Sequence, residues 1–274
     1  MASKPSRPQS QKHLAVLIDA DNASAAIVEG LFEEIARFGI ASVKRIYGDW
    51  TSPQLGGWKK ALLEHSIQPM QQFAYTTGKN ATDSALIIDA MDLLYTRRFD
   101  GFCLVSSDSD FTRLAARLRE EGLEVIGFGE QKTPEPLRKA CDKFIYTELL
   151  RNDAETGDPE SSSGTTSTAS KAANAEDPRV ATPSTPAKVK PLKVPLASIA
   201  KVIDDNSDED GWCHLSALGT NISKLHSDFD VRLYGHKKLS DLIKAHQSHF
   251  ELQQRATAAS GGKAFYARNR KPGK

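Results

Sequence analysis

The chain is short of the features that mark secreted and membrane proteins. Its 274 residues include only three cysteines, widely spaced and without a C-x-x-C pair, so neither a disulfide framework nor a zinc module is indicated. No segment approaches the ~20 consecutive apolar residues of a membrane-spanning helix. The polar N-terminus, MASKPSRPQSQKH, has no apolar core of the kind that secretory signals carry. We therefore expect no membrane association and a cytoplasmic location.

The chain also lacks a large excess of charge of either sign. Its 36 Lys and Arg residues face 35 Asp and Glu residues, which excludes a uniformly basic protein that coats nucleic acid. The balance is uneven along the chain, because residues 1–150 hold 18 basic and 20 acidic side chains whereas residues 194–274 hold 12 and 9. Acid is thus concentrated early in the chain and base late.

Aromatic residues are absent from one long central segment. Residues 151–193 are dominated by Ser, Thr, Ala and Pro, which bury too little apolar surface to offset the entropy lost on ordering. This composition predicts a flexible linker that joins a domain at 13–150 to a second domain at 194–270. The polar residues 1–12 are expected to be disordered.

Before the linker, apolar runs typical of strands alternate with amphipathic runs typical of helices. This alternation predicts a doubly wound α/β domain, in which helices cover both faces of a mostly parallel sheet. The expected strands are 13–19, 41–49, 67–75, 99–108 and 123–129, and the expected helices are 25–39, 57–66, 83–97 and 111–122.

After the linker, the pattern predicts a small winged-helix domain. Three amphipathic helices are expected first, and two strands that form a hairpin follow them. The helices are expected at 194–205, 214–225 and 235–246, and the strands at 250–255 and 264–268.

Acidic residues follow the carboxyl ends of two predicted strands. Asp19 ends the first strand, Asp108 and Asp110 follow the fourth, and Asp83 opens the third helix. Ligands of an open parallel sheet bind beyond these strand ends, so the carboxylates converge if the first and fourth strands are neighbours. For any single one of these aspartates, capping of the next helix is the alternative role.

Several carboxylates at close range repel one another, and a hard divalent cation removes that repulsion. The pattern therefore predicts a Mg²⁺ or Mn²⁺ site that acts on a phosphate ester through a metal-bound water. Lys79, just before the third helix, would meet the phosphate as a point charge.

Three motifs together resemble the NYN domain, a family of PIN-like ribonuclease domains. They are LIDADN at 17–22, KNATDSALIIDAMDLLY at 79–95 and LVSSDSDFTRLAARLREEGLEVIGFG at 104–129, and the resemblance covers residues 13–150. It implies a hydrolase that cleaves RNA phosphodiester bonds with bound Mg²⁺. Carried over by position, it implies catalytic and metal-binding roles for Asp19, Asp83, Asp108 and Asp110. Asn22, Ser106 and Lys79 are expected to contact substrate, and Lys79 departs from the family pattern, standing four residues before Asp83 where many relatives have it three before.

The C-terminal segment resembles the OST-HTH or LOTUS domain, most clearly in LYGHKKLSDLIKAH at 233–246. That family is a winged helix implicated in RNA binding or in protein docking. Lys237 and Lys238 stand at the start of a predicted helix, where backbone N–H groups also favour phosphate, so we expect them to bind substrate. Phe265 and Tyr266 alternate across a predicted strand, so one is expected to pack inward and the other to be free to stack on a base.

Two functions remain open from the sequence. The first is a metal-dependent ribonuclease to which the C-terminal domain delivers RNA. The second is a catalytically inactive adaptor that binds RNA or regulates, with a vestigial acidic cluster. All four matched positions are still Asp, which favours the ribonuclease. RNA is the expected partner, with protein docking by the C-terminal domain as the alternative, and the oligomeric state is not determined.

Overall fold

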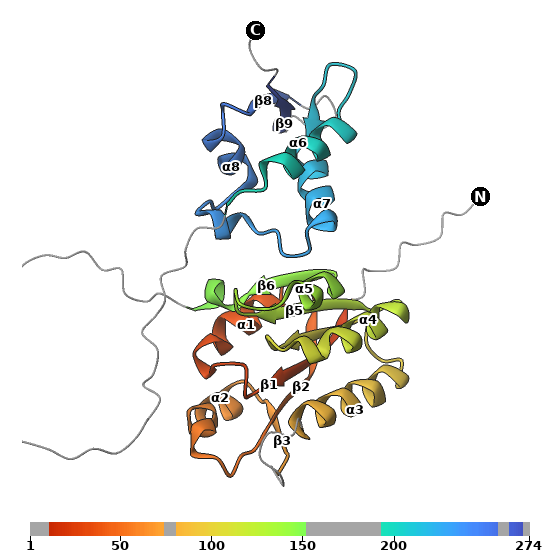
Figure 1. The fold of residues 1–274 in the computed structure, drawn as a ribbon, viewed down its shortest axis with the longest axis vertical. Helices are drawn as coiled ribbons and strands as arrows, with labels where there is room; N and C mark the ends of the chain where they lie inside the picture. Colours follow the sequence, from red (N-terminus) through yellow and green to blue (C-terminus); the bar gives the residue numbers. More distant parts are fainter. Residues whose placement is uncertain (1–10, 74–80, 152–192, 257–262, 271–274) are drawn as a thin grey trace, which may run out of the picture.

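The computed structural model describes residues 11–73, 81–151, 193–256 and 263–270, which form two domains (Figure 1). Residues 1–10 of the predicted N-terminal segment, nearly all of the predicted linker and Lys79 lie outside these residues. The predicted disorder is wrong for Lys12, whose carbonyl accepts from the Ile40 amide at 2.8 Å. Within the described part of the chain, no helix is both long and apolar enough to cross a membrane.

The N-terminal domain is built on a six-stranded sheet in the order β3-β2-β1-β4-β5-β6, in which every neighbouring pair is parallel. This confirms the predicted doubly wound α/β fold. The strands are β1 (His13–Asp19), β2 (Ile40–Gly48), β3 (Gln68–Gln71), β4 (Gly101–Val105), β5 (Glu124–Gly129) and β6 (Lys143–Tyr146).

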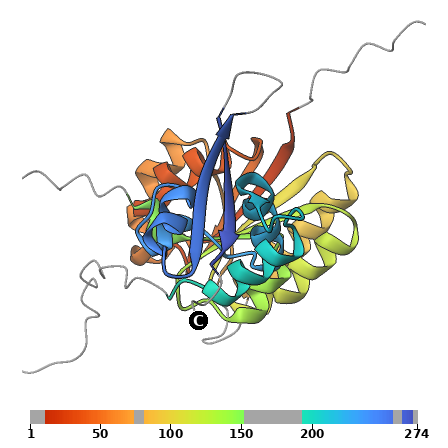
Figure 2. The same cartoon turned by 90° about the horizontal axis from the view of Figure 1, so that it is seen from above.

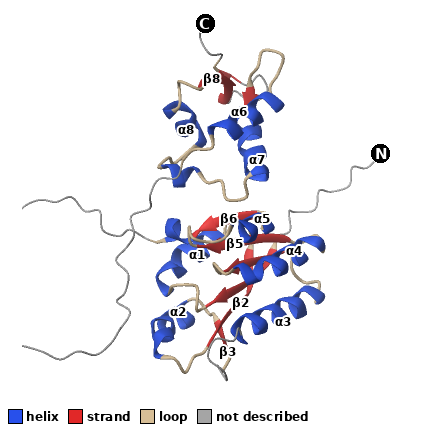
Figure 3. Cartoon of the chain, in the orientation of Figure 1, coloured by secondary structure: helices blue, strands red, loops and turns tan. Residues whose placement is uncertain are grey.

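Helices cover both faces of this sheet (Figure 3). On β1, Leu14, Val16 and Ile18 pack toward α1 and α2, whereas Ala15 and Leu17 pack toward α3, α4 and α5. Because both faces are buried, the strand is an unbroken apolar run. The helices are α1 (Val28–Ile35), α2 (Trp58–Glu64), α3 (Ala81–Tyr95), α4 (Thr112–Glu120) and α5 (Glu135–Ala140).

The last helix and the last strand of the N-terminal domain, α5 and β6, were not predicted from the sequence. Helix α5 has six residues and β6 has four, so neither is long enough to show a helical or strand period. Of the expected strand 67–75, β3 covers Gln68–Gln71, where it pairs with β2. Residues 74 and 75 lie outside the described part of the chain.

The C-terminal domain packs three helices against an antiparallel sheet in the order β7-β9-β8, in which β8 and β9 form the predicted hairpin. The two-residue strand β7 was not predicted, since His214 was expected to begin a helix. The third helix begins four residues later than predicted, because a 3-10 turn over Val231–Tyr234 ends at Gly235 in the left-handed region (φ 78°). The elements are α6 (Leu196–Asp205), β7 (Cys213–His214), α7 (Leu215–Leu225), α8 (Leu239–Ala245), β8 (Phe250–Ala256) and β9 (Lys263–Asn269).

The C-terminal domain contacts the β6 edge of the large sheet, above which it lies in Figure 1. The Phe144 amide donates to the Ser227 carbonyl at 2.8 Å, which extends the hydrogen bonding of β6 into the loop after α7. Asp228 in the same loop accepts hydrogen bonds from Arg138 and from the Tyr146 hydroxyl. The two domains therefore meet through specific polar contacts.

Arg232 makes a second ion pair between the domains, with a buried glutamate. Its guanidinium donates to both carboxylate oxygens of Glu34 on α1, at 3.0 and 3.1 Å, and also pairs with Asp230. Glu34 is only 5% exposed, so its charge depends on cationic partners. Beside the pair, Leu233 and Tyr234 pack against the core of the N-terminal domain.

Replacement of Arg232 by Met is expected to destabilise the full chain by about 1–3 kcal/mol, because the buried Glu34 loses two hydrogen bonds and keeps only the exposed Arg37 as an ion-pair partner. Arg37→Met is the matched control, since Arg37 also contacts Glu34 at 3.0 Å but its side chain is 63% exposed. Its loss should cost under about 1 kcal/mol. Chemical denaturation measures both, and equal losses in the two variants would contradict a role for the domain contact.

Candidate functional site

Asp19 stands at the carboxyl end of β1, in the middle of the large sheet. Strands β1 and β4 are neighbours, with Ile18 opposite Val105, so Asp19 and Ser106 lie side by side beyond the strand ends. The Asp19 carboxylate is fully buried and accepts three hydrogen bonds, from the Asp21 amide, the Asn22 side-chain amide and the Ser106 hydroxyl, at 2.8–3.0 Å. These donors satisfy a charge that would otherwise be costly to bury.

Asp108 and Asp110 lie in the segment that leads from β4 into α4. Asp108 caps the 3-10 turn Ser109–Phe111, and its carboxylate accepts from the Asp110 amide at 2.9 Å. The Asp108 amide in turn donates to the Ser106 hydroxyl at 3.0 Å. The capping role that the sequence left open therefore holds for Asp108, and Ser106 links its loop to Asp19.

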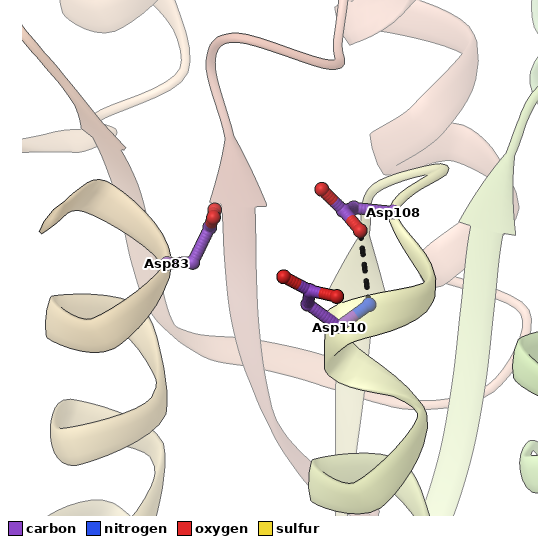
Figure 4. Close-up of side chains that lie close together, drawn as sticks. All are labelled: Asp83, Asp108 and Asp110. Atoms are coloured by element: carbon purple, nitrogen blue, oxygen red, sulfur yellow. Dashed lines mark hydrogen bonds between the residues drawn. The ribbon is translucent and has the colours of Figure 1, made fainter. Parts of the chain in front are cut away.

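Three carboxylates converge beyond the strand ends. Asp83, in the first turn of α3, points toward Asp108 and Asp110 (Figure 4), and one oxygen from each lies within 4.8 Å of the others. Mg²⁺ and Mn²⁺ prefer oxygen ligands of this type, so the donor set fits either ion. Asp19 is not one of the three, although its charge acts on Asp83.

The carboxylates of the cluster carry like charges and lie close enough to shift one another's pKa. The pKa of Asp83 is raised to about 6, first by burial and then by the charges of Asp19, Asp108, Asp110 and Asp21. Each neighbouring carboxylate makes the ionised form of Asp83 less favourable. A bound cation would reverse this effect, because its positive charge favours the ionised form.

A further acidic residue, Asp49, was missed in the sequence analysis. It follows the end of β2, and the pKa of Asp21 is raised by burial, then by the charge of Asp19 and last by the charge of Asp49. The Asp49 carboxylate accepts hydrogen bonds from the Thr51 amide and the Gln71 side chain. Its position directly after a strand is the same signal that identified Asp19 and Asp108.

The residues predicted to contact substrate lie beside Asp19, outside the described residues, or at the start of α8. Asn22 and Ser106 hydrogen bond to Asp19, so both help to hold that carboxylate, and their contact with substrate stays a prediction. Lys79 lies outside the described residues. Lys237 and Lys238 are exposed immediately before α8, and their substrate contact also stays a prediction.

Asp89 and Asp92, on the same helix as Asp83, lie apart from the cluster. Asp89 accepts hydrogen bonds from Arg45 and from the Tyr47 hydroxyl on β2, which ties the middle of α3 to the sheet. Asp92 is exposed. Of the acidic residues on α3, only Asp83 joins the three-carboxylate group.

Comparison with known proteins identifies both domains. The NYN domain family model matches residues 13–150, and the OST-HTH/LOTUS domain model matches residues 190–260. No curated protein matches the chain. The resemblance to both families that the sequence motifs indicated is thus confirmed.

Two solved structures are similar to parts of the chain. One is a protein of unknown function from Vibrio parahaemolyticus RIMD 2210633, with 19% identity, 51% of this chain and 95% of that chain covered, and a TM-score of 0.43. The other is an uncharacterized protein from Nitrosomonas europaea, with 34% identity, 36% of this chain and 96% of that chain covered, and a TM-score of 0.30.

Proposed function

The chain belongs to the NYN domain family and carries an OST-HTH/LOTUS domain after it, and on this basis we propose that it is a metal-dependent ribonuclease. The first domain indicates a PIN-like nuclease family and the second indicates RNA binding. The observation that carries the proposal is the convergence of Asp83, Asp108 and Asp110 from two separate elements onto one point beyond the sheet.

In this proposal, Asp83, Asp108 and Asp110 hold Mg²⁺ or Mn²⁺. The bound ion supplies a polarised phosphoryl oxygen and an activated water for hydrolysis of the phosphodiester bond. Asp19 acts as a positioning residue, because its carboxylate fixes Ser106, and Ser106 accepts from the amide of Asp108. The pairing of β1 with β4 therefore helps to fix the position of the loop that carries Asp108.

The two halves of the chain divide the work in this proposal. Residues 1–150 carry a small net negative charge and a concentrated group of carboxylates, which repel phosphate in the absence of metal. Residues 194–274 carry a net positive charge and supply most of the attraction to RNA. Tethering in one chain raises the local concentration of RNA at the acidic cluster.

Metal binding is tested by thermal unfolding of the full chain during titration with Mg²⁺ or Mn²⁺. We expect a saturable rise in Tm, since an ion that binds only the folded state stabilises it. Asp83→Asn should abolish this rise and should itself melt at higher temperature than the wild type in EDTA, because it removes a charge from a crowded group. Asp92→Asn, on the exposed side of the same helix, is the matched control and should behave as wild type.

The pH dependence in EDTA has a definite sign. The folded-state pKa of Asp83 lies above its ordinary value, so the folded protein binds this proton more readily than the unfolded chain. The contribution of Asp83 to stability is therefore greatest at low pH and is lost as the pH rises through about 6. Asp83→Asn should lack this component. If neither ion stabilises the wild type, the adaptor function replaces the nuclease.

A further inference from the structure

The three-stranded sheet of the C-terminal domain has one face that packs on helices and one face that does not contribute to the core. Phe250, Cys213 and Ala267 point toward α6, α7 and α8 and are buried. Side chains alternate across a strand, so the residues between them point to the opposite face. That outer face carries Trp212, His214, Arg255, Tyr266 and Arg268, which we call the wing surface. In the view from above, β8 and β9 lie in front of the helices of this domain (Figure 2).

Planar cations and aromatic rings are interleaved on the wing surface. The Arg255 guanidinium lies 5.0 Å from the Trp212 ring centroid and 4.8 Å from that of Tyr266, so it lies close to both rings. Arg268 lies 4.5 Å from the Trp212 centroid. The His214 ring meets Tyr266 edge to face, with centroids 5.1 Å apart. Five side chains from all three strands and the residue before β7 thus form one connected cluster of rings and guanidinium groups.

Polar contacts at the rim hold the two guanidinium groups in place. Arg268 pairs with Glu251 at 2.6 Å, and Arg255 donates to the Gln253 side chain at 3.0 Å. Both arginine side chains nevertheless remain more than one third exposed, at 35% for Arg255 and 39% for Arg268. Their planes are therefore oriented before any ligand arrives and are still accessible, which lowers the entropic cost of binding a flat ligand.

We propose that the wing surface binds the unpaired bases of single-stranded RNA by stacking. Bases stack on aromatic rings and on guanidinium planes, and the same arginines attract the adjoining phosphates. Bases inside a duplex already have both faces covered, so this surface distinguishes single strands from duplexes. The inference rests on the RNA-binding role in the proposed function and adds a base-stacking surface to the phosphate contacts expected of Lys237 and Lys238.

Of Phe265 and Tyr266, which point to opposite sides of β9, Tyr266 is the one placed to stack on a base. Phe265 lies on the opposite side of β9, the side that faces the helices, and the ammonium group of Lys244 lies 6.0 Å from its ring. Tyr266 instead lies beside His214 and Arg255 on the wing surface. Sequence alternation predicted that the two rings point in opposite directions, and the position of the helices decides which one faces outward.

The test measures binding of the full chain to a labelled, unstructured 12-nucleotide RNA and to a duplex of matched length, in EDTA to prevent cleavage and over a range of salt. The wild type should bind the single strand at least about tenfold more tightly than the duplex. Tyr266→Leu should weaken single-strand binding about tenfold, and Tyr266→Phe should stay within about twofold of wild type. Thermal unfolding of each variant checks that the fold is kept.

Arg255→Lys separates stacking from charge. Lysine keeps the positive charge but has no planar group, so affinity should fall several-fold while the slope of affinity against salt is unchanged. Lys201→Gln, at an exposed position on α6, is the control for loss of one positive charge outside the wing surface and should change affinity less than twofold.

Equal affinity for single strand and duplex would overturn the inference, as would wild-type binding by both Tyr266→Leu and Arg255→Lys. Absence of RNA binding by the full chain would also overturn it and would indicate a protein partner for this domain. The nuclease proposal is judged separately. If binding depends on Tyr266 but the wild type shows no cleavage with Mg²⁺ or Mn²⁺, the wing surface stands and the nuclease does not.

Discussion

Asp108→Asn is expected to reduce Mg²⁺-dependent RNA cleavage by the full chain by roughly 10²–10³-fold, while leaving its fold intact. A metal ligand supports several kcal/mol of charge stabilisation in the transition state, and each ~1.36 kcal/mol is tenfold in rate. Asparagine caps helices as well as aspartate does, so the hydrogen bond to the Asp110 amide survives. The substitution therefore removes the charge without removing the cap.

The same substitution at Asp19 changes stability as well as catalysis, so its effect on the cleavage rate is harder to interpret. The Asp19 carboxylate accepts from the Asn22 amide and the Ser106 hydroxyl through one oxygen and from the Asp21 amide through the other. An Asn side chain has one acceptor oxygen and one NH₂ group that only donates, so its NH₂ group would face a donor in a buried position. We expect Asp19→Asn to lose cleavage and also some stability.

Initial rates on a single-stranded RNA pool, together with Tm, measure both variants. Asp92→Asn serves as the control that changes an exposed carboxylate on α3. Cleavage that survives in both Asp108→Asn and Asp19→Asn, or that continues undiminished in EDTA, would exclude a metal-dependent activity of this site.

Ending the chain at Arg151 is expected to weaken RNA binding by at least about tenfold and to flatten its salt dependence. Each phosphate contact that is lost removes ~0.7 units from the slope for a single strand, because fewer counterions are released. Cleavage at saturating RNA should change little, since Asp19, Asp83, Asp108 and Asp110 all remain. Lys237→Ala combined with Lys238→Ala in the full chain should reproduce part of the loss.

Because the C-terminal domain also stabilises the N-terminal domain, the truncation should be tested in a second, compensated form. Without the C-terminal domain, Glu34 loses Arg232, and the packing of Leu233 and Tyr234 is also lost. Glu34→Gln in the truncated chain removes the buried charge and should restore part of the stability. If both truncated forms are folded and bind RNA as tightly as the full chain, the OST-HTH/LOTUS domain docks a protein partner instead.

Local pattern in the sequence was sufficient for the class of fold. The apolar run of β1 is long enough to identify a strand buried on both faces, and α3 and α4 are long enough to show helical spacing. Position after a strand also identified Asp19 and Asp108 as candidates, because the strand end is visible in the sequence. Elements as short as α5 and β6 left no such signal.

Only the tertiary structure decided which of these residues meet. Strand order places β4 beside β1, which joins Asp19 to Ser106, and the start of α3 brings Asp83 to Asp108. Glu34 and Arg232 are 198 positions apart, and no local pattern links them. Composition and periodicity describe neighbours along the chain, whereas ion pairs, metal ligands and stacked rings depend on packing between distant segments.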